Sequence, residues 1–189
     1  RVKEPGLVTA AAGSTAEELL AACGGMQNGH KFKAYLPGGA SGGILPASKA
    51  DIPLDFGGRL AEEGCFVGSH AVVILSDQDN VWQVAQNLMQ FFAHESCGQC
   101  TPCRSGTDKA AELMAAPCSD TDLLGELAVT MADASICGLG QAAPNPLLSA
   151  IKYFPQDMNR MDIIQGDLRQ GESLSAKAKP AGKRALSYE

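Results

Sequence analysis

Three cysteines lie on one short stretch of the chain, at Cys97, Cys100 and Cys103, with two residues between successive members. A fourth, Cys137, lies further along in the segment Ile-Cys-Gly-Leu-Gly that spans residues 136–140. Thiolates are soft ligands that select zinc, copper(I) or iron-sulfur clusters over hard cations. The spacing therefore indicates a metal centre of one of these kinds.

The arrangement of one triple and one single favours an iron-sulfur cluster over zinc. A structural zinc site usually pairs two separated Cys-x-x-Cys hairpins, or Cys with His, around one small tetrahedral ion. A [4Fe-4S] cluster is larger and takes four protein ligands, one for each iron. We predict that these four ligands are Cys97, Cys100, Cys103 and Cys137.

Two alternatives use the same cysteines, namely a zinc site and disulfide bonds. The chain has seven cysteines, an odd number, and no visible secretory signal, which fits a reducing compartment better than disulfides. The other three, Cys23, Cys65 and Cys118, have no cysteine at ligand spacing. We expect them to be small buried side chains, the usual state of a free cysteine.

The residues between the cysteines suit a cluster. Gly98 lets the backbone approach inorganic sulfide closely, and Pro102 stiffens the loop. A helical pattern follows over about 104–115. Its positive N-terminal end, with the charge of Arg104, is expected to face the anionic cluster.

Helical patterns also flank this loop on both sides. Apolar residues at helical spacing predict one helix ending near Glu95, a third after the capping segment 119–122, and a short fourth from Pro144 to about Tyr153. The first helix leads into the cysteine loop, and the third leads back to Cys137. We predict a four-helix unit over residues 77–157 with the cluster at one end. Its core is expected to include Trp82, Met89, Phe91 and Phe92.

Residues 1–76 have the pattern of a small α+β unit. Strands are predicted over residues 7–10 and 31–36, and the apolar run at 65–75 predicts a central strand. Ser14 or Thr15, followed by two glutamates, predicts the start of a helix that two glycines end.

The stretch at residues 37–46 is the most glycine-rich in the chain. It lacks the Gly-Lys-Ser/Thr ending of a P-loop and the spacing Gly-x-Gly-x-x-Gly. We expect a tight loop with several left-handed residues. A surface that docks a partner or faces a nucleotide is the alternative.

Composition excludes several classes of function. The net charge of -6 argues against nucleic acid as a partner. No apolar run reaches the roughly 18 residues that a membrane span requires, so we expect no membrane insertion and a cytoplasmic location. The chain begins at Arg1, and we expect it to be a fragment; a natural truncation is the alternative. Residues 158–189 are predicted to be a flexible tail.

Residues 95–106, Glu-Ser-Cys-Gly-Gln-Cys-Thr-Pro-Cys-Arg-Ser-Gly, resemble the cluster motif of the NADH-binding flavoprotein subunit of respiratory complex I and its relatives. Residues 35–46 are similar to the soluble-ligand-binding β-grasp module of that family. The resemblance implies an α+β chain in which a β-grasp-like domain, residues 1–76, precedes the helical [4Fe-4S] domain at 77–157.

Within this family, residues 133–146 and 151–155 resemble the β subunit of soluble NAD-dependent molybdenum or tungsten formate dehydrogenase more than complex I. That resemblance implies two partners, a multi-cluster α subunit with molybdenum or tungsten and a γ subunit with a [2Fe-2S] cluster. Members of the family bind FMN and NADH on an upstream Rossmann-like domain, whose Gly-Arg-Gly-Gly-type loop does not occur here. We therefore expect FMN and NAD only on an upstream domain and no catalytic residue on this chain. If the chain is instead a natural truncation, it is a relative that has kept only the electron relay.

The function expected from the resemblance is electron relay between FMN and the clusters of a partner subunit, in an NAD-dependent formate dehydrogenase. Complex I and NAD-reducing hydrogenase are the alternatives within the family. A zinc-stabilised docking module without redox chemistry is the alternative of another class.

Overall fold

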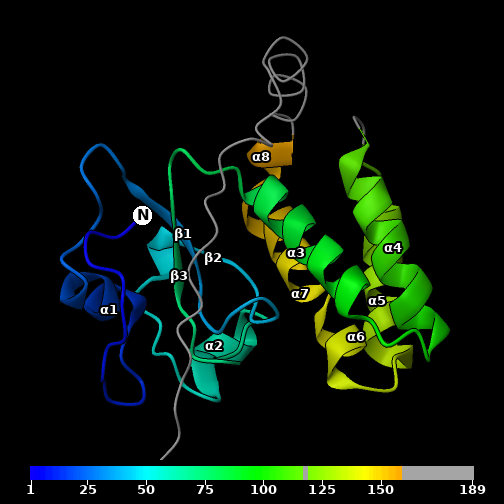
Figure 1. Ribbon diagram of the computed structural model, residues 1–189, viewed down its shortest axis with the longest axis horizontal. Coiled ribbons are helices and arrows are strands. Elements are labelled where there is room, and N and C mark those ends of the chain that lie inside the picture. Colours follow the sequence, from blue (N-terminus) through cyan, green and yellow to red (C-terminus); the bar gives the residue numbers. More distant parts are fainter. Residues whose placement is uncertain (117–118, 159–189) are drawn as a thin grey trace, which may run out of the picture.

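The structure, a computed structural model, describes residues 1–116 and 119–158. It consists of a small sheet with short helices beside a group of longer helices (Figure 1). The chain is therefore an α+β protein, as predicted. The elements in chain order are α1 Ala16–Ala22, β1 Phe32–Leu36, β2 Leu45–Pro46, the 3-10 helix Ala47–Lys49, α2 Gly58–Glu62, β3 Val73–Ser76, α3 Val81–Glu95, α4 Thr101–Ala115, α5 Thr121–Ala134, α6 Gly138–Ala142, α7 Asn145–Tyr153 and α8 Pro155–Met158.

The described sheet has three antiparallel strands in the order β2-β1-β3. Its central strand is β1, the predicted strand at 31–36, whose Tyr35 pairs with Leu45 on one side and Ile74 on the other. The prediction of a central strand over residues 65–75 was wrong, because only Val73–Ser76 forms a strand and it lies at the sheet edge. The predicted strand at residues 7–10 was also wrong, since this segment has no strand structure and is exposed.

The glycine-rich loop explains why residues 65–72 do not form a strand. Their backbone groups bond to the loop instead: Phe66 N donates to Gly42 O, Ser69 N donates to Gly38 O, and Ala71 O accepts from Gly39 N. The two segments approach so closely that a Cβ on Gly38 would lie 2.2 Å from the backbone nitrogen of Gly68. The tight loop predicted at residues 37–46 is confirmed, with Gly39 and Gly43 at positive φ.

Local capping signals fix where the helices begin. Thr15 and Glu18 form the reciprocal bonds of a capping box at α1, as the sequence predicts. At α3 the cap is Asn80, whose side chain accepts from Gln83 N at 2.9 Å. Asp79 closes the turn that precedes α3, because its carboxylate accepts from both the backbone N–H and the hydroxyl of Ser76.

The helices predicted around the cysteines are present, and α6 and α8 are two further short helices. Trp82 and Met89 of α3 are buried in a core cluster that also contains Leu36 and Ile44, so this cluster joins the sheet to the helices. Phe92 is buried as well, and a second cluster, which includes Tyr35 and Leu45, lies within the sheet half. Phe91, expected in the core of the helical unit, is 46% exposed because it lies on the opposite side of α3 from the buried positions.

Two polar clusters also join the sheet to the helices. The carboxylate of Asp157, in α8, accepts from Lys33 Nζ of β1 at 2.6 Å and from Val81 N at the start of α3 at 2.7 Å. Glu63, which follows α2, bonds Lys49, Lys152 and the Tyr153 hydroxyl. None of the described helices is long and apolar enough to cross a membrane. The predicted tail at residues 158–189 lies outside the described residues except for Met158.

Candidate metal centre

Helix ends position all four predicted ligands. Cys97 and Cys100 lie in the connection between α3 and α4, and Cys100 is the N-cap residue, immediately before the first residue of α4. Helix α4 starts at Thr101, earlier than predicted, because Pro102 is tolerated in a first turn, so Cys103 lies inside the helix. Cys137, like Cys100, is an N-cap residue: it lies immediately before α6, which begins at Gly138. The α3–α4 and α5–α6 connections lie at the same end of the helical half (Figure 1).

Two contacts bring the cysteine triple against the segment that carries Cys137. A Cβ on Gly140 would lie 2.4 Å from Ser135 Oγ and 2.8 Å from the Cβ of Cys103, so these residues meet there. The thiol of Cys100 is in turn approached by the backbone N–H of Ile136. The sequence separates these groups by more than thirty residues, and the fold makes them neighbours.

The surroundings of Cys100 favour its thiolate, which is the form that binds metal. The pKa of Cys100 is lowered, first by the N–H of Ile136 and then by the N–H of Cys103, with a smaller contribution from the Ser135 hydroxyl. Ser135 Oγ lies near Cys100 but makes no hydrogen bond of normal geometry to any described residue. The sulfur of Cys103 is 3.4 Å from Ser96 Oγ.

The loop that carries the triple is held in shape by its own residues. Gly98 has φ +76°, a left-handed conformation that favours glycine. The guanidinium of Arg104 donates to Gly98 O and to Thr101 Oγ1, while Ser96 Oγ accepts from Gly98 N at 3.3 Å. Arg104 therefore braces the loop that carries Cys97 and Cys100.

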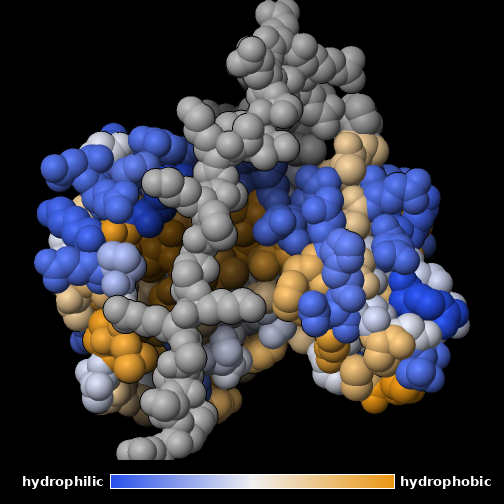
Figure 2. Space-filling view, in the orientation of Figure 1, coloured by the Kyte–Doolittle hydropathy of each residue, from blue (hydrophilic) through white to orange (hydrophobic). Residues whose placement is uncertain are grey.

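The four cysteines differ in exposure. Cys103 is buried, Cys100 is half-buried, and Cys97 and Cys137 are exposed. Next to Cys137, Ile136 is 72% exposed, and the surface at the α6 end of the helical half is partly hydrophobic (Figure 2). One side of the site is therefore closed by protein and the other is open.

These residues fit an iron-sulfur cluster. The donor set is four thiols, N–H groups approach one of them, and a buried hydroxyl beside them is unpaired. Within residues 1–116 and 119–158, no three His, Cys, Asp or Glu side chains are grouped to hold a single metal ion. The ligands of a [4Fe-4S] cluster need not be grouped so closely, because each thiolate binds a different iron.

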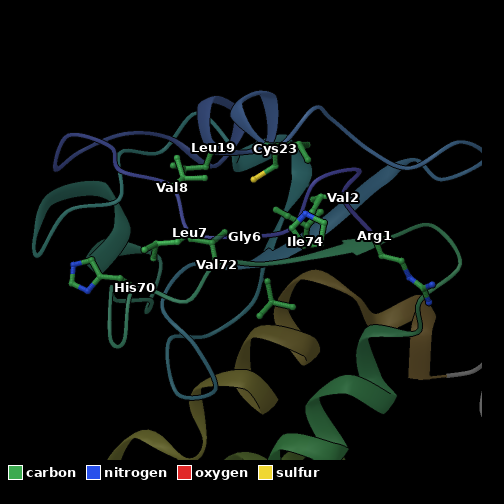
Figure 3. A pocket seen from close by; sticks show the side chains of 13 residues that line it. Arg1, Val2, Gly6, Leu7, Val8, Leu19, Cys23, His70, Val72 and Ile74 are labelled. Carbon is green, nitrogen blue, oxygen red and sulfur yellow. The ribbon is translucent and has the colours of Figure 1, made fainter. Parts of the chain in front are cut away.

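The remaining described cysteines lie elsewhere. Cys65 is buried, as predicted, and burial raises the pKa of its thiol to about 11. Cys23, predicted to be buried, is only half-buried, because it lines a hollow of about 380 Å³ between the N-terminal segment and β3 (Figure 3). All six described cysteines are free thiols, and Cys118 lies outside the described residues.

Ser96, Ser135 and Gly140 are residues of the site that the sequence did not single out. Each lies within five residues of a predicted ligand. Nothing in their type or spacing separates them from other small residues in the chain, so only the folded contacts identify them.

Four thiols at the ends of packed helices define a protein of the iron-sulfur class. Residues 83–161 match the family model described as the NADH-ubiquinone oxidoreductase-F iron-sulfur binding region, which indicates a [4Fe-4S] cluster. The family model and the relatives support a family of NADH-binding subunits, and the chain is similar to the C-terminal portion of its members.

Individual proteins that are similar to this chain support the same family. The F subunit of NADH-quinone oxidoreductase from Streptomyces coelicolor is 35% identical over 162 residues, which are 82% of this chain and 36% of the relative. The corresponding protein of Escherichia coli is 36% identical over 165 residues, 83% of this chain and 37% of the relative. NADP-reducing hydrogenase subunit HndC of Solidesulfovibrio fructosivorans is 32% identical, covering 83% of this chain and 33% of the relative.

A solved structure also has this fold. The NAD+-reducing [NiFe]-hydrogenase in the H2-reduced state matches 95% of this chain and 33% of its own chain, with a TM-score of 0.73 and 27% identity. The chain thus spans about a third of the length of the relatives it matches.

Proposed function

We propose that this chain is the electron-relay part of an NAD-linked oxidoreductase, and that Cys97, Cys100, Cys103 and Cys137 hold its [4Fe-4S] cluster. The observation that carries the proposal is the packing of Cys100 and Cys103 against residues 135–140, the segment of Cys137. When bound at these residues, a [4Fe-4S] cluster would accept and donate one electron at a time, which is the chemistry that an electron relay needs.

The residues of the chain prepare and shield the site. The N–H groups of Ile136 and Cys103 stabilise thiolate at Cys100, and Arg104 holds the loop. Burial of Cys103 excludes water from one side, while the exposed Cys97 and Cys137 leave the other side open to a partner's redox group.

FMN and NAD belong to an upstream domain in this proposal. It is supported by the names of the relatives, which are NADH- and NADP-linked enzymes, and by the third of their length that the chain spans. No residue of this chain is assigned to hydride transfer.

The finer assignment that we propose is the β subunit of a formate dehydrogenase, with molybdenum- or tungsten-containing α and [2Fe-2S] γ subunits as partners, in the cytoplasm. It is supported by the resemblance of residues 133–146 and 151–155 to that branch. In the same proposal, residues 1–76 are a β-grasp-like domain and 77–157 a four-helix cluster domain. Electrons would then flow from the α subunit towards NAD+.

A subunit of complex I or of an NAD-reducing hydrogenase is the second candidate, favoured by the relatives and the solved structure described above. Affinity purification of the tagged protein from its native host separates the two. Formate-dependent NAD+ reduction with molybdenum or tungsten in the complex supports the first candidate. Quinone- or hydrogen-linked activity supports the second.

The cluster itself is tested on the 189-residue chain purified without oxygen. We expect about four irons and four sulfides per chain, broad visible absorption, and an EPR signal on reduction. Colourless protein with about one zinc per chain would instead support the docking module.

A further inference from the structure

The hydroxyl of Ser135 is a buried polar group for which the protein supplies no partner among the described residues. Ser135 is 5% exposed, and its Oγ has no hydrogen-bond partner within that part of the chain. A buried hydroxyl left unpaired costs free energy, and such groups in native proteins usually meet a ligand, ion or water. Because this hydroxyl lies beside the cysteines, a sulfur of the bound cluster is the partner that its position indicates.

The backbone of Ser135 is already fully used. Its N–H donates to Met131 O at 3.2 Å as the last bond of α5, and its carbonyl accepts from Gln141 Nε2 at 2.9 Å. These two bonds fix the residue between α5 and α6. The hydroxyl is therefore the one polar group of Ser135 that remains available to a bound group.

The free hydroxyl is next to two of the predicted ligands. Ser135 Oγ and the Cβ of Cys103 both lie against the Cα of Gly140, where a side chain would collide with them. The N–H of Ile136, the next residue, lies close enough to Cys100 to lower the pKa of its thiol. A hydroxyl donates a hydrogen bond, and thiolate or sulfide sulfur accepts one, so the chemistry is complementary.

We propose that Ser135 donates a hydrogen bond from its hydroxyl to a sulfur of the bound cluster, either inorganic or from a ligating cysteine, and thereby raises the reduction potential. The inference rests on the function proposed above. Hydrogen bonds to the sulfurs are among the factors that set the potential of an iron-sulfur cluster. The direction follows because reduction adds negative charge, which a donated hydrogen bond stabilises.

The test compares reduction potentials of the full chain, measured by EPR-monitored redox titration without oxygen. For Ser135→Ala we expect a cluster that is harder to reduce, with a change of about tenfold in the equilibrium constant, or about 59 mV for one electron. Ser135→Thr retains the hydroxyl and should stay near the wild-type value. The matched control is Ser149→Ala, another serine with 5% exposure, whose hydroxyl is satisfied by Asn145 O at 2.7 Å.

A second measurement detects the hydrogen bond itself. Pulsed electron-nuclear double resonance on reduced protein in H2O and D2O should show an exchangeable proton coupled to the cluster in wild type and Ser135→Thr. This proton signal should be missing from Ser135→Ala. A merely structural role for Ser135 would change stability but neither the potential nor this signal.

An unchanged potential and proton signal in Ser135→Ala, with the cluster intact, would overturn this inference alone. Absence of a [4Fe-4S] cluster from wild type would overturn the proposed function as well. If Ser135→Ala does not retain the cluster, Ser135→Thr decides: a retained cluster at wild-type potential supports the hydroxyl's role, and a lost cluster contradicts it.

Discussion

The four predicted ligands lie in unequal surroundings, which makes their roles separable by mutation. Cys103 is buried beneath Ser96 and Gly140, whereas Cys137 is exposed in front of α6. Replacing an exposed cysteine removes a ligand without opening a cavity. Its effect on the metal centre is therefore expected to exceed its effect on the fold.

Cys137→Ala should lose the cluster or convert it to a form with fewer irons, because one iron loses its protein ligand. The free energy of unfolding of the metal-free chain should change by no more than about 0.5 kcal/mol, as for other exposed sites. Iron and sulfide analysis, EPR and urea unfolding measure these effects, with Cys23→Ala as the control. A full four-iron cluster with unchanged spectra in Cys137→Ala would show that the fourth ligand is another residue.

Arg104 acts on the shape of the cysteine loop. Arg104→Ala removes the donors to Gly98 O and Thr101 Oγ1, so the loop that holds Cys97 and Cys100 should open more often. We expect iron to be lost to a chelator several-fold faster, since the hydrogen bonds of this exposed side chain contribute about 1 kcal/mol. Lys109→Ala, at an exposed position of α4, is the control, and equal rates for the two variants would contradict this role.

Between elements, the site depends on how closely α6 packs on α4. Gly140 permits this approach, because its Cα lies against Ser135 and Cys103. The short α6 was not predicted, yet it connects Cys137 to the rest of the site. The spacing between two helices is thus part of the metal centre.

Gly140→Ala should destabilise the chain by about 1–3 kcal/mol, the usual cost of inserting a methyl group into packed surroundings. The iron content should fall with it, because the new Cβ would push Cys103 away from the segment of Cys137. The matched control is Gly125→Ala in α5, where no atom lies within 4 Å of the added Cβ. That substitution should raise stability by up to about 1 kcal/mol through helix propensity. Urea unfolding that showed the same sign for both variants would contradict the packing argument.

Across the whole molecule, the sheet and the helices are joined by a shared core and by Asp157. This residue is 1% exposed, and its carboxylate pairs with Lys33 of the sheet and accepts from the first N–H of α3. A local change at Asp157 is therefore expected to affect the stability of the entire chain. The division into domains at residue 76 stays a prediction.

Asp157→Ala should lower the free energy of unfolding by about 3–5 kcal/mol, because it leaves Lys33 and the Val81 N–H without their shared acceptor. Asp157→Asn, which retains an acceptor but not the charge, should cost less. Glu112→Gln, in an exposed pair with Lys109, should change stability by no more than about 0.5 kcal/mol. Urea unfolding provides all three values, and equal losses for Asp157→Ala and Glu112→Gln would show that the buried pair is not important.

The cluster around Glu63 predicts how stability depends on pH. Hydrogen bonds from Lys49, then Tyr153, then Lys152 lower the pKa of Glu63 from its usual 4.5 to about 2. Because the folded pKa is below the unfolded one, this stabilisation is complete above about pH 4.5 and is lost as the pH falls towards 2.

Glu63→Gln should therefore be less stable than wild type near neutral pH, and the difference should shrink between about pH 4.5 and 2. Urea unfolding at several pH values measures it, and the comparison cancels any loss of the cluster in acid, which both proteins share. Glu62→Gln, at the neighbouring exposed carboxylate, is the control. A difference between Glu63→Gln and wild type that stays constant down to pH 2 would contradict the lowered pKa.

The local features of this protein could be predicted from its amino-acid sequence. Cysteine spacing indicated a [4Fe-4S] cluster, the motif at residues 95–106 resembled that of a known family, and periodicity with capping residues predicted α1 and the longer helices. These features depend on residues a few positions apart, so they can be read along the chain. The assignment of the four individual ligands stays a prediction.

The contacts between distant segments became known only from the folded chain. In the fold, residues 65–72 are a partner of the glycine-rich loop rather than a strand, and Phe91 points outward. Ser135 and Gly140 lie beside Cys100 and Cys103. Such contacts depend on packing between residues far apart in the chain, which neither periodicity nor spacing encodes.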